Sequence, residues 1–477
     1  MEPTKTDLVV VGAGPGGYTA AFYAADRGKK VILVEQDPRL GGACLNVGCI
    51  PSKALLHATG VLRVAEESRA RGISFGPAQV ELAQLRSWKE SVLQKLGDGI
   101  RGLAQKRGVD VWQGRGHFED SQTLRVETSQ GQRFIRFDKA IIAVGSKPAI
   151  PAAFDLGNRR VMTSTEALEM EEIPETLLIV GGGYIGLELG TVYATLGTRV
   201  VLAEALGTLL SGVDPDLVRP VARYAERAFK EVRLNVKVTQ MSTSGRQVRV
   251  STERNGQKVE ELYDRVLVSI GRLPHCADLG LQHTRVTRSD KGFIQVDEKQ
   301  QTTDPHILAI GDVVGGMMLA HKASKEARVA VEVICGEASL FQGVVIPAVV
   351  FTDPEVAWCG LTESEARARN IPIEVARFPW SASGRALSMD RTDGLTKLIL
   401  EPETERVLGV GLVGHGVGEL ISEGVLAVEM GATARDIAET VHPHPTLSET
   451  LMEAAESFYG TSANALPRRR GEKTTGG

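Results

Sequence analysis

The sequence predicts an α/β protein with two Rossmann-like dinucleotide-binding domains and a C-terminal α+β domain. Two copies of a strand–glycine turn–helix–strand unit, over about 7–35 and 177–204, are the first two observations behind this prediction. The third is a change of pattern after about residue 346, where strands and helices mix without a glycine fingerprint. With 477 residues, the chain is long enough for about three domains.

The first unit begins with a short apolar run at 7–11, which predicts a buried parallel strand. This strand runs into a G-x-G-x-x-G turn whose glycines are Gly12, Gly14 and Gly17. A helix and a second strand at 30–34 follow, and Glu35 ends that strand 23 residues after Gly12. In this context the glycines permit a tight turn, the helix N-terminus receives a pyrophosphate, and Glu35 accepts a hydrogen bond from a ribose hydroxyl.

The second unit repeats this order. A strand at 177–180 leads into a turn whose glycines are Gly181, Gly183 and Gly186. Glu204 ends the next strand, again 23 residues after the first glycine. Two such units on one chain predict two bound dinucleotides. A flavin with a nicotinamide is the natural pair, because a flavin can take a hydride from one partner and exchange electrons with a dithiol.

Cys44 and Cys49 lie in Gly41–Lys53, shortly after the first fingerprint, and are the most informative residues of the chain. Such a pair could pack in a core, staple a loop, bind a metal or occur by chance. No second Cys or His pair has metal-ligand spacing, and a bridge across so short a loop stabilises little. The composition is also not that of a secreted protein. The sequence therefore predicts a redox-active disulfide beside a bound nucleotide cofactor.

The spacing of the two cysteines predicts an irregular backbone between them. On a regular helix they would lie about 140° apart around the axis, too distant for a disulfide. Gly48 supplies conformational freedom, and Pro51 removes an amide and crowds the carbonyl of Val47, so we expect a kinked helix. A helix that begins here would also direct its N-terminal dipole at the sulfurs and favour a thiolate.

Composition excludes several classes of partner. The 55 Lys and Arg against 59 Asp and Glu give a net charge of −4, which indicates neither nucleic acid nor a membrane surface. The longest apolar stretch, 177–187, is shorter than the roughly 18 residues of a membrane span. A first strand at about Asp7 leaves no room for a signal or transit peptide. We expect a cytoplasmic protein whose packing thiols are Cys276, Cys335 and Cys359.

Two later segments complete the expected architecture. A strand at 307–310 ends at Gly311 and Asp312, which places a carboxylate at a sheet edge where α/β proteins bind ligands. Strands at 344–351 and 395–400 then mix with a helix at 418–430, as in an α+β domain that serves as an interface. The expected domains are 1–150, 151–271, 272–345 and 346–465, followed by a disordered tail at 466–477.

After the cysteine segment, His442–Glu449 is the second segment that contains a candidate catalytic side chain. Histidine accepts and returns a proton near neutral pH, which a dithiol substrate needs because only its thiolate attacks a disulfide. Thr446 and Glu449 also fit a capping box that begins a helix through about Phe458. Glu449 could instead hold His444 in one tautomer, and we expect it to do only one of the two. His444 is a candidate base, with a structural or surface role as the alternative.

Together these motifs resemble the pyridine nucleotide–disulfide oxidoreductases over nearly the whole chain, and within that family the branch that oxidises dihydrolipoamide. The segments that carry the resemblance are the two fingerprints, Gly41–Lys53, Gly311–Asp312, Phe378–Trp380 and His442–Thr446. It implies a homodimer with FAD at the first fingerprint, NAD at the second, and dihydrolipoamide as substrate. That substrate would be carried on the lipoyl domains of a 2-oxoacid dehydrogenase or glycine cleavage complex. Proline at 443, where alanine is more usual, is a small departure.

The resemblance also implies roles for single residues. Cys44 would exchange with substrate, Cys49 would face the flavin, and Lys53 would lie at the flavin's redox-active edge. His444 and Glu449 would form the acid–base pair, supplied by the partner subunit. The residues that would contact FAD are Gly12, Gly14, Gly17, Glu35, Gly42, Lys53, Gly116, Asp312 and Ala320. Those that would contact NAD are Gly181, Gly183, Gly186, Glu204, Val238 and Gly271. None is assigned to a metal.

Other branches of the family share this architecture. A mercuric reductase or a high-molecular-weight thioredoxin reductase would need a cysteine pair at the C-terminus, whereas the last cysteine here is Cys359. Glutathione reductases normally take NADPH, and Cys49–Lys53 matches the lipoamide enzymes better. A non-catalytic flavoprotein would not need both cysteines, Lys53 and His444.

Overall fold

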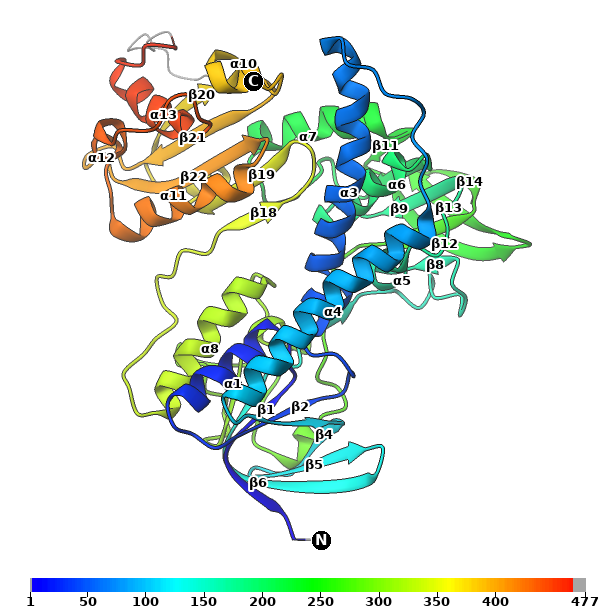
Figure 1. Cartoon of the computed structure of the whole chain (residues 1–477), viewed down its shortest axis with the longest axis vertical. Coiled ribbons are helices and arrows are strands. Elements are labelled where there is room, and N and C mark those ends of the chain that lie inside the picture. Colours follow the sequence, from blue (N-terminus) through cyan, green and yellow to red (C-terminus); the bar gives the residue numbers. More distant parts are fainter. Residues whose placement is uncertain (1, 466–477) are drawn as a thin grey trace.

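A computed structural model describes residues 2–465, so the predicted tail at 466–477 lies outside the described part. Three larger sheets with their helices form the body of the molecule (Figure 1). Helices α3 (Cys49–Glu67) and α4 (Leu82–Lys106) leave the N-terminal part, and α3 rises between the other two parts (Figure 1). Within residues 2–465, no helix combines the length and apolar character needed to span a membrane.

The N-terminal sheet has seven strands. They are β1 (Thr4–Val11), β2 (Val31–Glu35), β3 (Asp110–Gln113), β4 (Arg115–Asp120), β5 (Thr123–Thr128), β6 (Gly131–Ile142) and β17 (Ile307–Ala309). β1 and β17 both pair in parallel with β6, so Val11, Ile142 and Ala309 end at the same edge. This pairing brings the Gly311–Asp312 turn beside the first fingerprint, although the two are far apart in the sequence.

Both faces of this sheet are covered, which explains why β1 is a continuous apolar run. Leu8 and Val10 pack into one core cluster, while Val9 and Val11 pack into another on the opposite face. Helices α1 (Pro15–Asp26) and α8 (Ala320–Ile334) pack against each other beside the sheet (Figure 1). Burying each of these Leu and Val side chains stabilises the fold by about 1.5–3 kcal/mol.

The second sheet is parallel throughout, in the order β11-β10-β9-β15-β8. Its strands are β8 (Val161–Met162), β9 (Thr176–Val180), β10 (Arg199–Glu204), β11 (Glu231–Leu234) and β15 (Arg265–Val268). Its helices are α5 (Ser164–Glu169), α6 (Tyr184–Thr195) and α7 (Pro215–Ala228). An antiparallel sheet of β12 (Lys237–Ser244), β13 (Gln247–Arg254) and β14 (Gln257–Tyr263) projects from it (Figure 1).

The third sheet is antiparallel, in the order β18-β19-β22-β21-β20. Its strands are β18 (Ala348–Val350), β19 (Glu355–Gly360), β20 (Glu374–Pro379), β21 (Leu395–Leu400) and β22 (Val407–Gly414). Its helices are α9 (Glu363–Ala368), α10 (Gly384–Ser388), α11 (Val417–Met430), α12 (Ala434–Glu439) and α13 (Glu449–Tyr459). The predicted fold class, two Rossmann-like parts and an α+β part, is confirmed. The strand expected over 344–351 is shorter, because only its second half pairs with β19.

A buried ionic cluster joins the second and third sheets. Lys397 on β21, only 1% exposed, donates to Asp214, Asp216 and Glu363 at 2.7, 2.7 and 2.8 Å. These three carboxylates are close enough together to hold a metal ion, but the ammonium group contacts all of them. Arg377 also pairs with Asp216 and Glu363, so removing Lys397 would leave the buried Asp214 without its cation, at a cost of about 3–5 kcal/mol.

Candidate active site

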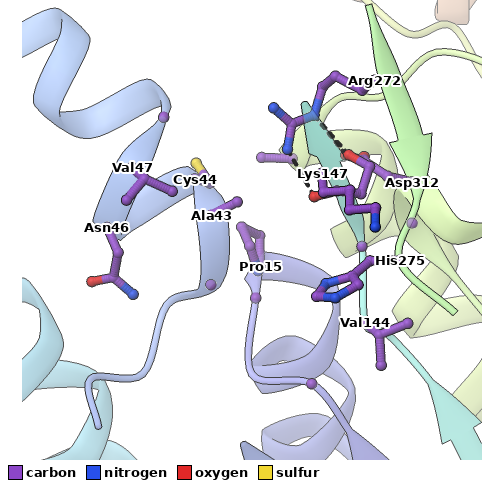
Figure 2. A pocket seen from close by; sticks show the side chains of 18 of the residues that line it. Pro15, Ala43, Cys44, Asn46, Val47, Val144, Lys147, Arg272, His275 and Asp312 are labelled. Atoms are coloured by element: carbon purple, nitrogen blue, oxygen red, sulfur yellow. Dashed lines mark hydrogen bonds and ion pairs between the residues drawn. The ribbon is translucent and has the colours of Figure 1, made fainter. Parts of the chain in front are cut away.

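A cavity of about 410 Å³ lies between the first fingerprint, the cysteine segment and the start of α6. Figure 2 shows its two walls. One wall, at the start of α2 (Gly42–Val47), carries Ala43, Cys44, Asn46 and Val47. The opposite wall carries Val144, Lys147, Arg272, His275 and Asp312. The cavity therefore brings together segments from four distant parts of the sequence.

The residues predicted to contact FAD gather at this cavity, with one exception. The lining includes both cysteines and Gly12, Gly14, Glu35, Gly42, Lys53, Gly116, Asp312 and Ala320. Gly17 does not line it, because a Cβ at Gly17 would lie 1.8 Å from the carbonyl oxygen of Gly12. Gly17 thus permits the close approach of helix and turn, as the third glycine of such a fingerprint does.

The second fingerprint repeats the geometry of the first outside this cavity. A Cβ at Gly186 would lie 2.4 Å from the Gly181 oxygen, and one at Gly181 would lie 2.6 Å from the Ser269 oxygen. Nothing lies within 4 Å of the Cβ position of Gly183. The middle glycine therefore faces open space at the N-terminus of α6, where a phosphate can approach the backbone.

Gly12 and Gly14 occupy the equivalent positions in the first fingerprint. A Cβ at Gly12 would lie 2.5 Å from the Ala143 oxygen, so the turn packs directly against the end of β6. The nearest atom to a Cβ at Gly14 would be the Gly42 Cα at 3.9 Å. This open side of Gly14 faces the cavity, so a ligand phosphate can approach the N-terminus of α1 there.

The two acidic residues that end β2 and β10 have equivalent hydrogen bonds. Glu35 accepts from Ala13 N at 2.7 Å, and Glu204 accepts from Gly182 N at 2.6 Å. The second oxygen of Glu204 accepts from Leu206 N at 2.7 Å. Burial raises the pKa of Glu35, although the backbone amides that it accepts from oppose this shift. Each carboxylate therefore holds its glycine turn against the end of the strand that follows.

The two other residues predicted near NAD lie by the second sheet. Val238 on β12 is buried, and it packs in one core cluster with Val180 and Ala203 at the ends of β9 and β10. Gly271 has a φ of +133°, and nothing lies within 4 Å of its Cβ position. It immediately precedes β16 (Arg272–Pro274) and follows Ser269 and Ile270, which a Cβ at Gly181 would contact.

The helix carrying the cysteines is interrupted between them. α2 ends at Val47, Gly48 has φ −147° and ψ −115°, and α3 begins at Cys49. A Cβ at Gly48 would lie 2.8 Å from the Ala43 oxygen, so glycine allows this close approach. Pro51 was expected to kink a continuous helix, and this was wrong. Because the helix restarts at Cys49, Pro51 lies in the first turn, where no amide is needed.

Both cysteines are free thiols in this structure, and they are hydrogen-bonded to each other. The bond to Cys49 raises the pKa of Cys44 far above its usual value, with burial acting in the same direction. The same bond lowers the pKa of Cys49 to about 7, and the Lys53 charge also lowers it. Cys49 therefore becomes the thiolate of the reduced pair, at the N-terminus of α3. A disulfide in the oxidised protein stays a prediction.

Lys53 has a buried carboxylate partner that the sequence analysis did not identify. Its Nζ lies 2.8 Å from Glu188 Oε2 on α6, and 4.6 Å from the ring centre of Phe351. The other Glu188 oxygen accepts from Phe351 N at 3.0 Å. Glu188 thus links α3, α6 and the start of the third sheet. A charged residue within an apolar helix was the sequence signal that could have indicated it.

His444 and Glu449 form the predicted pair, with one correction. His444 Nδ1 is hydrogen-bonded to Glu449 Oε1 at 2.8 Å, and Thr446 N donates to Glu449 Oε2 at 2.7 Å. The predicted capping box is not formed: α13 begins at Glu449, its N-cap residue Ser448 makes no side-chain cap bond, and only the bond from Thr446 N to Glu449 is present. Burial opposes ionisation of Glu449, but the hydrogen bonds from Thr446 and His444 outweigh it and lower the pKa of the carboxyl.

His444 does not line the cavity that holds Cys44 and Cys49. Its side chain is 79% exposed, in the connection between α12 and α13, which pack in the part of the molecule built on the third sheet (Figure 1). Exposed apolar side chains occur in the same part, including Leu426, Met430 and Val441. The thiols and the candidate base are thus not brought together within one chain.

Comparison with known proteins agrees with this architecture. Residues 6–327 match the family profile described as pyridine nucleotide-disulphide oxidoreductase, and residues 346–455 match the dimerisation domain of the same family. The chain is 45% identical over 470 residues to a dihydrolipoyl dehydrogenase of Vibrio parahaemolyticus, covering 98% of each chain. It is 42% identical over 464 residues to that of Geobacillus stearothermophilus, covering 97% of this chain and 98% of the relative.

Solved structures show the same likeness. LpdA from Mycobacterium tuberculosis superposes with a TM-score of 0.88 at 26% identity, covering 95% of this chain and 99% of that one. The HOCl-induced flavoprotein disulfide reductase RclA from Escherichia coli has a TM-score of 0.83 at 27% identity, covering 93% and 98%. The chain belongs to the pyridine nucleotide-disulphide oxidoreductase family.

Proposed function

We propose that this protein oxidises dihydrolipoamide to lipoamide and reduces NAD⁺ to NADH. The observation that supports this most directly is the thiol pair Cys44–Cys49 in one cavity wall, with Lys53 and the first fingerprint around it. Full-length relatives named dihydrolipoyl dehydrogenase, at 41–45% identity, point to the same reaction. The balanced reaction is dihydrolipoamide and NAD⁺ to lipoamide, NADH and a proton.

The residues of the cavity fit FAD. Gly14 leaves its open side to a diphosphate at the N-terminus of α1, and Glu35 lies where a ribose hydroxyl would donate. Gly42, Gly116, Asp312 and Ala320 would complete the FAD contacts, and Lys53 would lie beside the reactive part of the flavin. When bound, FAD accepts an electron pair from the dithiol and passes it to NAD⁺ as a hydride.

The thiol chemistry follows from the unequal cysteines. One sulfur of dihydrolipoamide, deprotonated by His444, attacks Cys44 Sγ, which breaks the Cys44–Cys49 bond and forms a mixed disulfide. Cys49 leaves as the thiolate, which its lowered pKa favours. The second substrate thiol then loses its proton and attacks the substrate sulfur of the mixed disulfide, which releases lipoamide, and the departing Cys44 thiolate, whose pKa is raised, takes up that proton. Two electrons are now held on the reduced cysteine pair.

Glu449 supports the base in this scheme. A hydrogen bond from His444 Nδ1 to the Glu449 carboxylate leaves Nε2 free to accept the substrate proton. The carboxylate also stabilises the imidazolium that results. Since His444 is remote from the cavity of its own chain, we propose that it serves the cavity of a second subunit in a homodimer. The dimerisation domain of the family at 346–455 supports this arrangement.

The remaining assignments follow the sequence analysis. We propose that 1–150 and 272–345 form the FAD-binding part, 151–271 the NAD-binding domain and 346–465 the dimer interface. We also propose a cytoplasmic location, and lipoyl domains of a 2-oxoacid dehydrogenase or glycine cleavage complex as the carriers of the substrate. The reducing compartment that a cycling dithiol requires supports this location.

A paired steady-state assay tests the proposed function. We expect the purified protein to be yellow and to reduce NAD⁺ with dihydrolipoamide at a kcat/KM at least a hundredfold above that for NADPH with glutathione disulfide, about 2.7 kcal/mol. Separate arms vary the thiol substrate and the coenzyme independently. Dihydrolipoamide is tested with NAD⁺ and with NADP⁺, and glutathione disulfide is tested with NADPH and with NADH. A higher kcat/KM for glutathione disulfide with NADPH than for dihydrolipoamide with NAD⁺ would contradict the proposal.

The nicotinamide coenzyme is expected to be NAD rather than NADP. Glu204 ends β10 beside the second fingerprint, and a 2′-phosphate would meet its negative charge. The following residues, 205–208, contain no arginine that could pair with a phosphate. We expect at least a tenfold preference in kcat/KM for NAD⁺, about 1.4 kcal/mol. Glu204→Ser should reduce this ratio, while Glu226→Gln, at an exposed position on α7, should not. Equal kcat/KM values with the two coenzymes in the natural chain would disprove the assignment.

A further inference from the structure

The chain passes between its two dinucleotide-binding parts twice, and the two passages are hydrogen-bonded to each other. β7 (Ser146–Pro148) leads out of the first sheet, and β16 leads back to it. They pair as antiparallel strands, with Pro274 opposite Ser146. A backbone bond from Ala149 N to Gly271 O, at 3.0 Å, extends this pairing toward the second sheet. A displacement of one passage therefore displaces the other.

Ser146 lies on the first passage and Arg272 on the second. The Ser146 hydroxyl connects Arg272 to Asp312 in the cavity wall. It accepts from Arg272 Nε at 2.7 Å and donates to Asp312 Oδ2 at 2.5 Å. Arg272 also donates through Nη2 to the Ser146 carbonyl at 2.8 Å, and its Nε lies 3.9 Å from Asp312 Oδ2. Figure 2 shows Arg272 and Asp312 side by side in one cavity wall.

These contacts are shielded from water. Ser146 is 7% exposed, and the side chain of Arg272 is 16% exposed. In such surroundings a hydrogen bond to a charged group is stronger than at the surface, and an unpaired partner is costly. Asp312, whose side chain is 24% exposed in the cavity wall, is therefore held on its protein side by Ser146 and Arg272.

The same passage reaches the second fingerprint at its other end. Ser269 lies two residues before Gly271, and its hydroxyl contacts the oxygens of Val180 and Gly181 at 3.1 and 3.3 Å. A Cβ at Gly181 would lie 2.6 Å from the Ser269 oxygen, so turn and passage are in direct contact. Between the second fingerprint and Asp312, every step is thus a covalent link, a hydrogen bond or a close packing contact.

We infer that Ser146 and Arg272 are positioning residues that couple the two dinucleotide sites. A dinucleotide at the second fingerprint would fix the backbone at Gly271 and so restrict Arg272, which through the Ser146 hydroxyl holds Asp312 toward FAD. Such a coupling is reciprocal, so FAD must tighten NAD⁺ binding by the factor by which NAD⁺ tightens FAD binding. The inference rests on the proposed places of FAD and NAD at the first and second fingerprints.

The test measures binding without turnover, using the oxidised FAD-loaded protein and NAD⁺. FAD release in a mild chaotrope is followed by gel filtration at set times and by the absorbance of the free flavin. We expect saturating NAD⁺ to slow this release about fivefold in the natural chain. In Ser146→Ala the slowing should fall below about twofold. Ser146→Thr keeps a hydroxyl and should retain the full effect.

A control variant and a second measurement complete the design. Ser68→Ala removes a buried serine hydroxyl that does not line the cavity, and should keep the fivefold effect. If Ser146→Ala does not retain FAD, the affinity for NAD⁺ is compared with and without FAD. Tighter NAD⁺ binding in the presence of FAD must then appear in the natural chain and be lost in Arg272→Lys.

Two results would overturn the inference. One is equal slowing in the natural chain and Ser146→Ala, and the other is no effect of NAD⁺ on FAD release in the natural chain. Failure of the natural chain to bind FAD or NAD⁺ at all would instead contradict the proposed function. The absorbance of the loaded protein and a direct NAD⁺ titration separate these cases.

Discussion

Serine in place of Cys49 should abolish dihydrolipoamide turnover while FAD stays bound. A serine hydroxyl cannot form the bond to Cys44 that substrate must break, and no thiolate can leave at the start of α3. We expect kcat/KM to fall by at least about a thousandfold, as for the loss of other catalytic nucleophiles. Steady-state NADH production gives the rate, and the flavin absorbance of the purified variant gives the bound FAD.

Thiol counting in denaturant tests the same bond directly. Five cysteines less the two in the bridge leave three reactive thiols in the oxidised natural protein, and five after reduction. The Cys49→Ser variant should show four thiols in either state. Cys335→Ser is the matched control, because Cys335 does not line the cavity and should be replaceable without loss of rate. Near-normal turnover by Cys49→Ser would contradict the redox pair.

Activity should return when two inactive variants exchange subunits. Cys44→Ser lacks the sulfur that substrate attacks, and His444→Gln lacks the base, so each homodimer is inactive. If one chain supplies Cys44 and its partner supplies His444, a hybrid dimer has one site with both residues intact. Random exchange of equal amounts makes half of the dimers hybrids, so about a quarter of the natural number of sites should be active.

The design has a control within the same chain. Cys44→Ser mixed with Cys49→Ser should stay inactive, because both sulfurs of one site come from one chain, and every hybrid site lacks one of them. Chains with different tags establish that exchange has occurred. An inactive mixture of Cys44→Ser and His444→Gln, with exchange demonstrated, would exclude a site composed of two chains. The 79% exposure of His444 and its absence from the cavity lining make this outcome unexpected.

The features that the sequence predicts best are those that depend on a few consecutive residues. Each fingerprint needs a strand, a turn in which a side chain would clash, and a helix, and all three are visible within one short segment. The nearest clash at both Gly17 and Gly186 is with the carbonyl oxygen of the turn's own first glycine, which explains why both copies could be recognised. The break at Gly48 is equally local, since the spacing of Cys44 and Cys49 excludes a regular helix.

The predictions that were wrong concern Pro51 and Glu449. Their roles depend on where each helix begins, which the spacing of residues in the sequence does not specify. Pro51 was expected inside a helix, yet the chain starts a new helix at Cys49 and leaves the proline in a first turn. Thr446 and Glu449 also fitted a capping box, yet α13 begins at Glu449 itself and only the bond from Thr446 N to Glu449 is present. A carboxylate has two oxygens with several acceptor positions, and here each oxygen has its own partner.

By itself, the sequence determined the two dinucleotide units, the C-terminal α+β part and the family, and it predicted the redox role of the cysteine pair. Only the tertiary structure decided which distant side chains meet. Lys53 pairs with Glu188, 135 residues away, and Ser146 joins Arg272 to Asp312, 126 and 166 residues away. Glycine turns and strand periodicity follow from local sterics, which short segments encode. Contacts between domains depend instead on how whole sheets and helices pack, and no spacing within a segment records that.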